Sequence, residues 1–392
     1  MDTNDKISEI LSRGVAEVID SKHLAEKLRG KKKLRIKLGI DPTSPNIHIG
    51  RAINLWKMRA FQDLGHTAVF IVGDFTGIIG DSSDKDSERP MLTLEQVKEN
   101  GKTYFEQAFK ILDKKKTEVH HNSEWLSKLN VLELSRIASQ FGLHEFAARE
   151  NIARRMKADK RVSYLELMYP LFQGYDSVAV KADVELGGTD QRFNLLTGRD
   201  VQKDYKQEPQ DIMMTEILEG TDGRKMSSSW GNVINITDEP NDMFGKVMSI
   251  KDELMPKYFV LATRVPLSEI KNMEDQAKSD PRNTKIRLAT ELVTLYHGKK
   301  AAKAAADEFE KVFSNKELPT DMPEVKVKAS NIVEVMMETG LVESKSEAKR
   351  LIEQGGVSLD GKKVTDETLR IQPITKDTVL QVGKRKFVKL VR

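Results

Sequence analysis

Apolar and polar positions follow two different periods over the first eighty residues. A run at 34–40 carries apolar side chains at every second position and ends at an Asp–Pro pair, which is typical of a buried strand. From 47 to 64 the apolar residues recur every three or four positions before a glycine, which predicts a helix. A β-rich run at 67–72 follows. Strand, helix and strand in this order predict a parallel βαβ unit.

The rest of the chain alternates between the same two periods. Before residue 230 we expect helices at 3–29, 94–112, 129–146 and 164–175, and strands at 117–121 and 178–186. After residue 230 we expect helices at 242–248, 254–263, 267–277, 281–298 and 301–313. Residues 315–328 hold two prolines and no period, which predicts a linker. The last segment predicts two short helices, a hairpin with an Asp–Gly turn, and two strands.

Composition narrows the class of protein. Hydrophobic residues make up 39% and charged residues 32% of 392 residues, as in a soluble globular protein of two or three domains. The absence of cysteine excludes disulfides and thiolate metal sites. No apolar run reaches the roughly 18 residues that cross a bilayer, and the polar N-terminus is no signal sequence. We therefore expect a cytoplasmic protein with no membrane partner.

The net charge of +4 is unevenly distributed. Residues 325–392 carry 14 Lys and Arg against 9 Asp and Glu, so the basic excess lies in the last segment. A basic module attached to a near-neutral body predicts a polyanionic partner, although ordinary surface lysines give the same count.

The first predicted helix begins with chemistry suited to a nucleotide. Residues 45–50 read Pro-Asn-Ile-His-Ile-Gly, which places His48 in the first turn beside free backbone N–H groups and the positive end of the helix dipole. Gly50 leaves room for a flat ring on the backbone. The same residues also fit a surface histidine and a packing glycine, because so short a match is a weak signal.

A second loop strengthens the nucleotide interpretation. Residues 223–229 read Gly-Arg-Lys-Met-Ser-Ser-Ser, a polar loop whose Lys225 and hydroxyls can close over phosphates. Together, the stretches at 45–50 and 225–229 resemble the HIGH and KMSKS signatures of class I aminoacyl-tRNA synthetases.

The segment 163–199 predicts a site for a small polar substrate. Tyr169, Gln173 and Asp176 lie on one face of the predicted helix, at i, i+4 and i+7. A phenol, an amide and a carboxylate do not form a core face, although a polar outer side of a helix has the same pattern. Asp190 and Gln191 follow a strand and two glycines. Asp81 ends the turn after the 67–72 strand, where open parallel sheets bind ligands.

Four stretches are similar to the bacterial tyrosyl-tRNA synthetase family. They read GIDPTSPNIHIGR, VGDFTGIIGD, YPLFQGYDSVAVKADVELGGTDQRFNLLTGR and GRKMSSSWGNVINI, and they cover most of residues 34–236 in the family's order. The resemblance implies activation of L-tyrosine by ATP, followed by transfer of tyrosine to tRNA(Tyr). The last segment also resembles a small RNA-binding domain of a ribosomal small-subunit protein, the S-four-like domain.

The resemblance also implies a fold and a domain order. We expect an α/β catalytic domain with a Rossmann-like, doubly wound parallel sheet at 1–230. A helical domain facing the anticodon region of tRNA is expected at 231–314. After the linker at 315–328, a small α+β S-four-like RNA-binding domain is expected at 329–392. A homodimer is implied as well.

Specific residues receive roles only through this resemblance. It implies ATP contacts from Asp41, Pro42, Thr43, His48, Gly50, Arg51, Gly188, Asp190, Lys225 and Ser228, with His48, Thr43 and Lys225 acting in catalysis. It implies tyrosine contacts from Lys37, Asp81, Tyr169, Gln173, Asp176 and Gln191. Lys85 and Arg89 are candidate phosphate contacts.

The expected chemistry depends on positioning rather than on a protein nucleophile. Asp176 is expected to accept the substrate phenol, and phenylalanine would leave that buried acceptor unpaired, so no editing domain is expected. Magnesium should arrive with ATP, held by phosphates and water. No metal site of the protein is predicted, because His120 and His121 lack further ligands at a suitable spacing.

Three positions depart from the family's pattern. Arg51 stands where the HIGH signature ends in histidine, Ser228 replaces the second KMSKS lysine, and Lys37 occupies a position where relatives often have tyrosine. Two other classes remain open on sequence alone: a tryptophan-activating enzyme, and a non-catalytic RNA-binding protein built on a synthetase body.

Overall fold

The computed structural model describes residues 2–81, 90–313, 318, 322–371, 378–383 and 386–391. The chain forms two compact units, at 1–302 and 303–392. Among the described residues, no helix is both long enough and apolar enough to span a bilayer.

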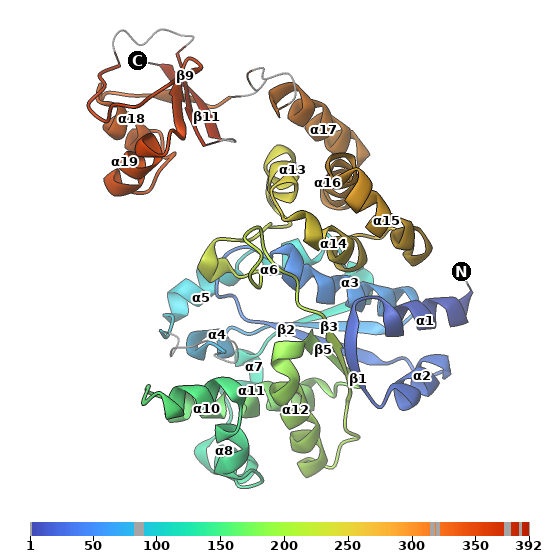
Figure 1. Cartoon of the computed structure of the whole chain (residues 1–392). Coiled ribbons are helices and arrows are strands. Elements are labelled where there is room, and N and C mark those ends of the chain that lie inside the picture. The colour runs from blue at the N-terminus through green and yellow to red at the C-terminus, as the bar shows by residue number, and fades with distance from the viewer. Residues whose placement is uncertain are drawn as a thin grey trace. The chain divides into compact units, whose positions relative to one another are not determined.

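A six-stranded sheet forms the centre of the first unit (Figure 1). Its strands are β1 (Val15–Ile19), β2 (Arg35–Ile40), β3 (Thr67–Val72), β4 (Thr117–His121), β5 (Val184–Gly188) and β6 (Asp211–Thr215). The spatial order is β1-β6-β5-β2-β3-β4, with β1 antiparallel to β6 and the other pairs parallel. The chain runs outward from β2 to β4 and then returns to β5 on the other side of β2. The strand order therefore reverses between β2 and β5, which is where ligands bind in such sheets.

Helices cover both faces of this sheet, as the doubly wound prediction requires. Figure 1 shows α3 (Ile49–Asp63) on one face and α11 (Tyr164–Val180) with α12 (Arg192–Asp204) on the other. Smaller helices surround them: α1 (Thr3–Ser12), α2 (Ser21–Arg29), α4 (Thr76–Ile79), α5 (Leu94–Gly101), α6 (Tyr104–Ala108), α7 (Ser123–Leu126), α8 (Val131–Ala138), α9 (Leu143–Ala147) and α10 (Glu150–Lys157). Because both faces are covered, β3 is buried along almost its whole length.

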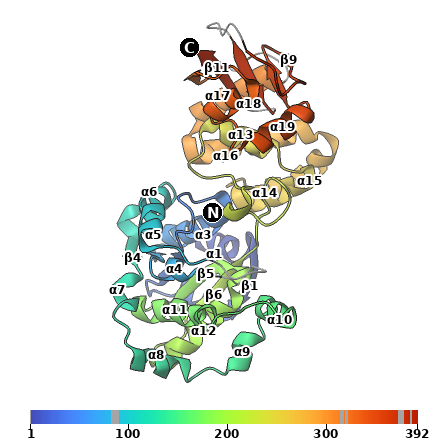
Figure 2. The ribbon, with the colours of Figure 1, turned by 90° about the vertical axis from the view of Figure 1, so that its left-hand side faces the viewer.

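The helical segment that follows begins inside the same unit. It comprises α13 (Pro240–Met248), α14 (Met255–Ala262), α15 (Leu267–Ser279), α16 (Pro281–His297) and α17 (Lys299–Phe313). Helices α13, α14 and α15 each pack on α16, and α14 also contacts α3. Figure 2 shows α14 between the sheet domain and helices α13 and α16. The buried side chains of Phe244, Tyr258 and Phe259 supply its core.

The second unit contains a five-stranded sheet and two helices. They are β7 (Glu324–Lys326), α18 (Ile332–Glu338), α19 (Lys345–Glu353), β8 (Val357–Leu359), β9 (Lys362–Lys363), β10 (Val379–Val382) and β11 (Lys386–Val391). The strand order is β7-β11-β10-β8-β9. Asp360 and Gly361 join β8 to β9 with φ of 48° and 76°, as the predicted Asp–Gly hairpin turn requires. An apolar cluster between helices and sheet confirms the α+β prediction.

Several predicted elements were wrong in type or extent. Residues 15–19 form edge strand β1 and do not continue a helix. Their backbone pairs with that of β6, a strand that the pattern did not predict. Helix α11 extends to Val180, so the strand expected at 178–186 begins only at Val184. The helices expected at 94–112 and 129–146 are each broken into two. The predicted linker at 315–328 contains β7, which pairs with β11.

Candidate active site

A cleft of about 370 Å³ opens at the carboxyl ends of the central strands of the first unit. Its wall brings together the loop after β2, the start of α3, the polar face of α11, the turn after β5 and the loop after β6. Most of the predicted site residues line it: Asp41, Thr43, His48, Gly50, Arg51, Asp81, Tyr169, Gln173, Asp176, Gly188, Asp190, Gln191, Lys225 and Ser228. Residues predicted from distant parts of the sequence thus share one cavity.

The start of α3 presents a neutral imidazole to the cleft. His48 is the N-cap of the helix, and its Nδ1 accepts the Arg51 backbone N–H at 3.3 Å. The proton therefore resides on Nε2, which leaves that nitrogen as a donor. Burial, together with the charges of Arg51 and Lys225, lowers the pKa of His48 well below its usual value. A Cβ on Gly50 would lie 3.1 Å from His48 Nδ1, so a larger residue at position 50 would press on the imidazole.

Arg51 braces the loop between β2 and α3. Its guanidinium donates to the Asp41 backbone oxygen at 3.3 Å, to Thr43 Oγ1 at 3.0 Å and to the Tyr104 hydroxyl at 3.1 Å. Pro42, in the same loop, is not on the cleft wall. Its carbonyl accepts from Asn100 at 3.0 Å, so the structure does not support the predicted contact of Pro42 with ATP.

One end of the cleft is built around Asp41 and Tyr169. The Tyr169 hydroxyl donates to Asp41 Oδ2 at 2.8 Å, and Thr76 donates to Asp41 Oδ1 at 2.7 Å. Burial and the neighbouring Asp41 raise the pKa of Tyr169 well above its usual value, so the phenol remains a donor. These contacts join α11 to the ends of β2 and β3.

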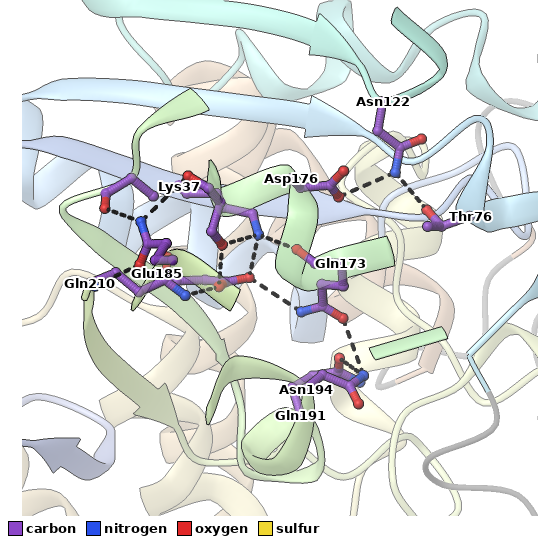
Figure 3. A network of polar contacts seen from close by, with 12 residues as sticks. Lys37, Thr76, Asn122, Gln173, Asp176, Glu185, Gln191, Asn194 and Gln210 are labelled. Atoms are coloured by element: carbon purple, nitrogen blue, oxygen red, sulfur yellow. Dashed lines mark hydrogen bonds and ion pairs between the residues drawn. The ribbon is translucent and has the colours of Figure 1, made fainter. Parts of the chain in front are cut away.

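Asp176 is a buried acceptor at the same end of the cleft. Its Oδ1 accepts from the Trp125 indole at 2.7 Å. Its Oδ2 accepts from Asn122 Nδ2 at 3.2 Å (Figure 3). Burial raises the pKa of Asp176 to about 7. The sequence reasoning missed both donors. Asn122 directly follows β4, so its place at a carboxyl strand end was an available signal, whereas nothing in the sequence pointed to Trp125.

A chain of amides links α11 to the turn after β5. Asn194 Nδ2 donates to the side-chain oxygens of Gln173 and Gln191, both at 3.1 Å. Gln191 Nε2 in turn donates to Asp81 Oδ2 at 2.6 Å. Figure 3 shows Asn194 between the two glutamines. Asn194 was not predicted, and it fixes the orientation of two residues that were.

Lys37 lies behind the cleft and is not part of its wall. Its side chain is fully buried, and its ammonium lies 2.9 Å from Glu185 Oε1. The direct contact of Lys37 with tyrosine stays a prediction. In this structure the ammonium donates to Gln173 and Ser177 and pairs with Glu185, which itself lines the cleft (Figure 3).

The loop after β6 reaches back over the cleft. Lys225 Nζ donates to Asp190 Oδ2 at 2.8 Å, so the predicted phosphate and ribose contacts pair with each other here. The Ser228 and Ser44 hydroxyls lie 3.0 Å apart and connect this loop to the one after β2. The predicted Lys85 and Arg89 lie outside the described residues.

The described part of the chain holds no group of three or more His, Asp or Glu side chains arranged to bind a metal ion. The two ring nitrogens of His120 lie 3.2 Å from Glu124 and 3.8 Å from Glu118.

The fold and the contents of the cleft match one class of enzyme. A sequence model of the class I tRNA synthetases (W and Y) matches residues 29–314. A second model, the tyrosine–tRNA ligase SYY-like C-terminal domain, matches residues 313–390. The two matched segments follow one another along the chain and together cover residues 29–390.

Relatives that match this chain over its full length show which family within the class I tRNA synthetases it belongs to. The tyrosine–tRNA ligase of Thermotoga maritima is 48% identical, and the match covers 99% of this chain and 98% of the relative. That of Carboxydothermus hydrogenoformans is also 48% identical, over 98% and 97% of the two chains. The chain belongs to the tyrosine–tRNA ligase family. The open alternatives of a tryptophan-activating enzyme and of a non-catalytic protein are not favoured by these relatives.

Solved structures share the fold at low sequence identity. Tyrosyl-tRNA synthetase from Archaeoglobus fulgidus, complexed with L-tyrosine, has a TM-score of 0.61 at 23% identity, over 78% of this chain and all of the other. A C-terminally truncated mitochondrial enzyme from Aspergillus nidulans has a TM-score of 0.66 at 22% identity, over 79% and 94% of the two chains.

Proposed function

We propose that this cleft joins L-tyrosine to ATP and that the chain then transfers the tyrosyl group to tRNA(Tyr). One observation carries the proposal: Asp176 and the helix start at His48–Gly50 line the same cavity. The first is an acceptor for a phenol, and the second is a site for adenosine phosphates. A tyrosine with its hydroxyl at Asp176 directs its carboxylate toward the nucleotide.

The polar groups around Asp176 support tyrosine as the amino acid. Both carboxylate oxygens already accept a hydrogen bond, and each oxygen retains a free lone pair for the substrate hydroxyl. We assign the ammonium to Tyr169, Gln173 and Asp81, and the carboxylate side to Gln191. An analogue without the hydroxyl leaves this buried carboxylate without its third hydrogen bond, which disfavours binding of the analogue.

The opposite end of the cleft suits ATP. We assign the phosphates to His48, Thr43 and Lys225, the adenine to Gly50, and the ribose to Asp190 and Gly188. A neutral His48 with its proton on Nε2 donates to a phosphate oxygen without carrying charge. We place magnesium on the ATP phosphates and water, as is usual for this ion.

The reaction requires positioning and charge stabilisation. A carboxylate oxygen of tyrosine forms a bond to the α-phosphorus of ATP, and the bond to pyrophosphate breaks. Donors fixed in advance stabilise the charge that develops on the phosphates. In the second step a hydroxyl at the 3′ end of tRNA attacks the tyrosyl carbonyl, and AMP leaves. Because this chemistry consumes ATP and tRNA, we propose a cytoplasmic location.

Replacing Asp176 tests the phenol contact. We expect Asp176→Asn to lower kcat/KM for tyrosine in ATP–pyrophosphate exchange by about 10- to 100-fold, as lost hydrogen bonds to charged groups typically do. We also expect weaker discrimination against phenylalanine. In the wild type, kcat/KM should fall as the pH drops through about 7, because protonation neutralises the acceptor.

A surface carboxylate provides the control for this variant. Asp204 pairs with Arg136 and does not line the cleft, so Asp204→Asn should keep the wild-type pH profile. An Asp176→Asn enzyme that still rejects phenylalanine as the wild type does would contradict the phenol assignment.

Replacing Lys225 tests the proposed phosphate contacts of the cleft. We expect Lys225→Ala to reduce tyrosyl-adenylate formation on the order of 100-fold, because a charge-stabilising donor is lost. The KM for tyrosine should change little. Lys257 is the matched control, since it pairs with Glu219 at 2.8 Å but does not line the cleft. If single-turnover activation by Lys225→Ala stayed near the wild-type rate, the assigned role of this loop would be wrong.

The second unit is proposed to bind RNA. Its basic excess supports a phosphate-backbone contact, which should weaken as salt is added. We expect deletion of residues 322–392, which removes the whole sheet including β7, to reduce tRNA charging much more than ATP–pyrophosphate exchange. Equal losses in the two assays would argue against this role.

We further propose a homodimer. Apolar side chains of the first unit are strongly exposed on neighbouring helices α8 to α11, with exposed fractions of 82% for Leu132, 81% for Tyr164 and 65% for Leu143. Figure 2 shows α8 and α9 at the end of the unit that lies opposite α14. Such a group of exposed apolar residues indicates an interface.

Sedimentation of the full chain tests the dimer. We expect the wild type to sediment as a dimer and Leu132→Asp as a monomer, because a charge would be buried at the interface. Leu318→Asp, at an exposed apolar position outside these helices, is the control and should leave the mass unchanged. A monomeric wild type at micromolar concentration would contradict the proposal.

A further inference from the structure

We propose that the buried Lys37–Glu185 ion pair is a positioning element that holds Gln173 and Asp176 in place to receive tyrosine. This inference rests on the proposed function, because it concerns the same amino-acid end of the cleft. It gives Lys37 a role different from the direct substrate contact that its position in the sequence suggests.

The pair joins the two strands between which the sheet order reverses. Lys37 on β2 and Glu185 on β5 are register partners in the parallel pairing, and their side chains are 0% and 2% exposed. The ammonium lies 2.9 Å from Glu185 Oε1. Burying two opposite charges gives little net stability, so such a pair more often specifies geometry.

The same two residues also hold α11. Lys37 Nζ donates to the Gln173 backbone oxygen at 2.9 Å and to Ser177 Oγ at 2.7 Å. Ser177 Oγ then donates to Glu185 Oε2 at 3.1 Å, and Gln173 Nε2 donates to Glu185 Oε1 at 3.2 Å. The helix is therefore fixed at residue 173, three positions before Asp176, and at residue 177, one position after it (Figure 3).

The network leaves Lys37 no proton for a substrate. An ammonium has three donors, and these meet Gln173, Ser177 and Glu185. The Gln210 side chain donates to the other oxygen of this carboxylate, Glu185 Oε2. Lys37 thus acts through its neighbours and does not touch tyrosine.

The charges of Lys37 and Glu185 also influence the pKa of Asp176. Lys37 lowers the pKa of Asp176 and Glu185 raises it, while burial is the largest cause of its elevation. The other groups facing this carboxylate are the neutral donors Trp125 and Asn122. Tyr169 and Asp41 lie further along the cleft, and His120 lies against the Trp125 ring. Removal of either charge of the pair should therefore shift the titration of Asp176, in opposite directions.

The main test removes both charges together. Lys37→Met with Glu185→Gln keeps the volumes similar and leaves no isolated buried charge. We expect the KM for tyrosine in ATP–pyrophosphate exchange to rise about tenfold, because misplaced contacts weaken binding of the reacting groups. The KM for ATP should change less than about twofold, since the network does not include the proposed ATP contacts.

A second buried pair on α11 provides the matched control. Arg155 and Glu166, 1% and 5% exposed, join the first turn of α11 to α10. Arg155→Met with Glu166→Gln should change thermal stability without a specific rise in the KM for tyrosine. Ser177→Ala is a milder variant that removes only the bridging hydroxyl, and it should raise this KM by a smaller factor.

The single variants separate positioning from mere stability. Lys37→Met should move the acidic limb of kcat/KM for tyrosine to higher pH, because the loss of a cation raises the pKa of Asp176. Glu185→Gln should move it to lower pH, because an anion is lost. A purely structural role would change the melting temperature but would not shift the two pH midpoints in opposite directions.

The outcomes distinguish this inference from the proposed function. An active wild type would overturn the positioning role alone if its double and Ser177→Ala variants kept the wild-type KM for tyrosine and its two single variants kept the wild-type pH midpoint. A wild type that fails to activate tyrosine would overturn both proposals.

Discussion

The parallel pairing of β2 with β5 is the constraint on which the site depends. These strands are adjacent in the sheet but nearly 150 residues apart in the chain, so their contact places two distant segments side by side. The loop after β2 then faces the turn after β5, and α11, which leads into β5, lies across both. Without this pairing, His48 and Asp190 would not share a cavity, and the polar face of α11 would have no substrate to meet.

The two ends of the cleft differ in charge, and this difference determines how a ligand is oriented between them. At one end Asp176 and Asp41 are surrounded by neutral donors in a dry environment, which raises the pKa of Asp176 and favours a hydroxyl or an ammonium as a partner. At the other end Lys225 and Arg51 lie near His48, whose pKa they help to lower. That end favours anions. A zwitterionic amino acid and a polyphosphate therefore have one favourable arrangement, with the carboxylate of the amino acid directed toward the nucleotide.

Sequence reasoning succeeded where the information is local. The bounds of β3 and β4 were predicted, because each strand has a clear period and a nearby turn or glycine. Strand β1 was not predicted, since it is defined by pairing with β6 across the sheet. The face of α11 that carries Tyr169, Gln173 and Asp176 followed from helical spacing. The hydrogen-bond partners of these side chains could not be predicted from helical spacing. Trp125, for example, lies 51 positions from Asp176, and only the folded chain brings the two together.

The residues that depart from the family signatures make contacts within the protein that the motifs alone do not predict. Arg51 replaces a histidine, yet its guanidinium contacts three different groups of the loop after β2, so it stabilises the loop that carries Asp41 and Thr43. Arginine suits this task because its planar fork presents several donors at once. Ser228 stands where the signature has a lysine, and its hydroxyl lies 3.0 Å from that of Ser44, which connects the 225–229 loop to the loop after β2. In this structure Arg51, Ser228 and Lys37 therefore all contact other groups of the protein. Lys225 also has a protein partner, because its Nζ donates to Asp190 Oδ2 at 2.8 Å, so the proposed contact of Lys225 with the ATP phosphates requires this pair to separate.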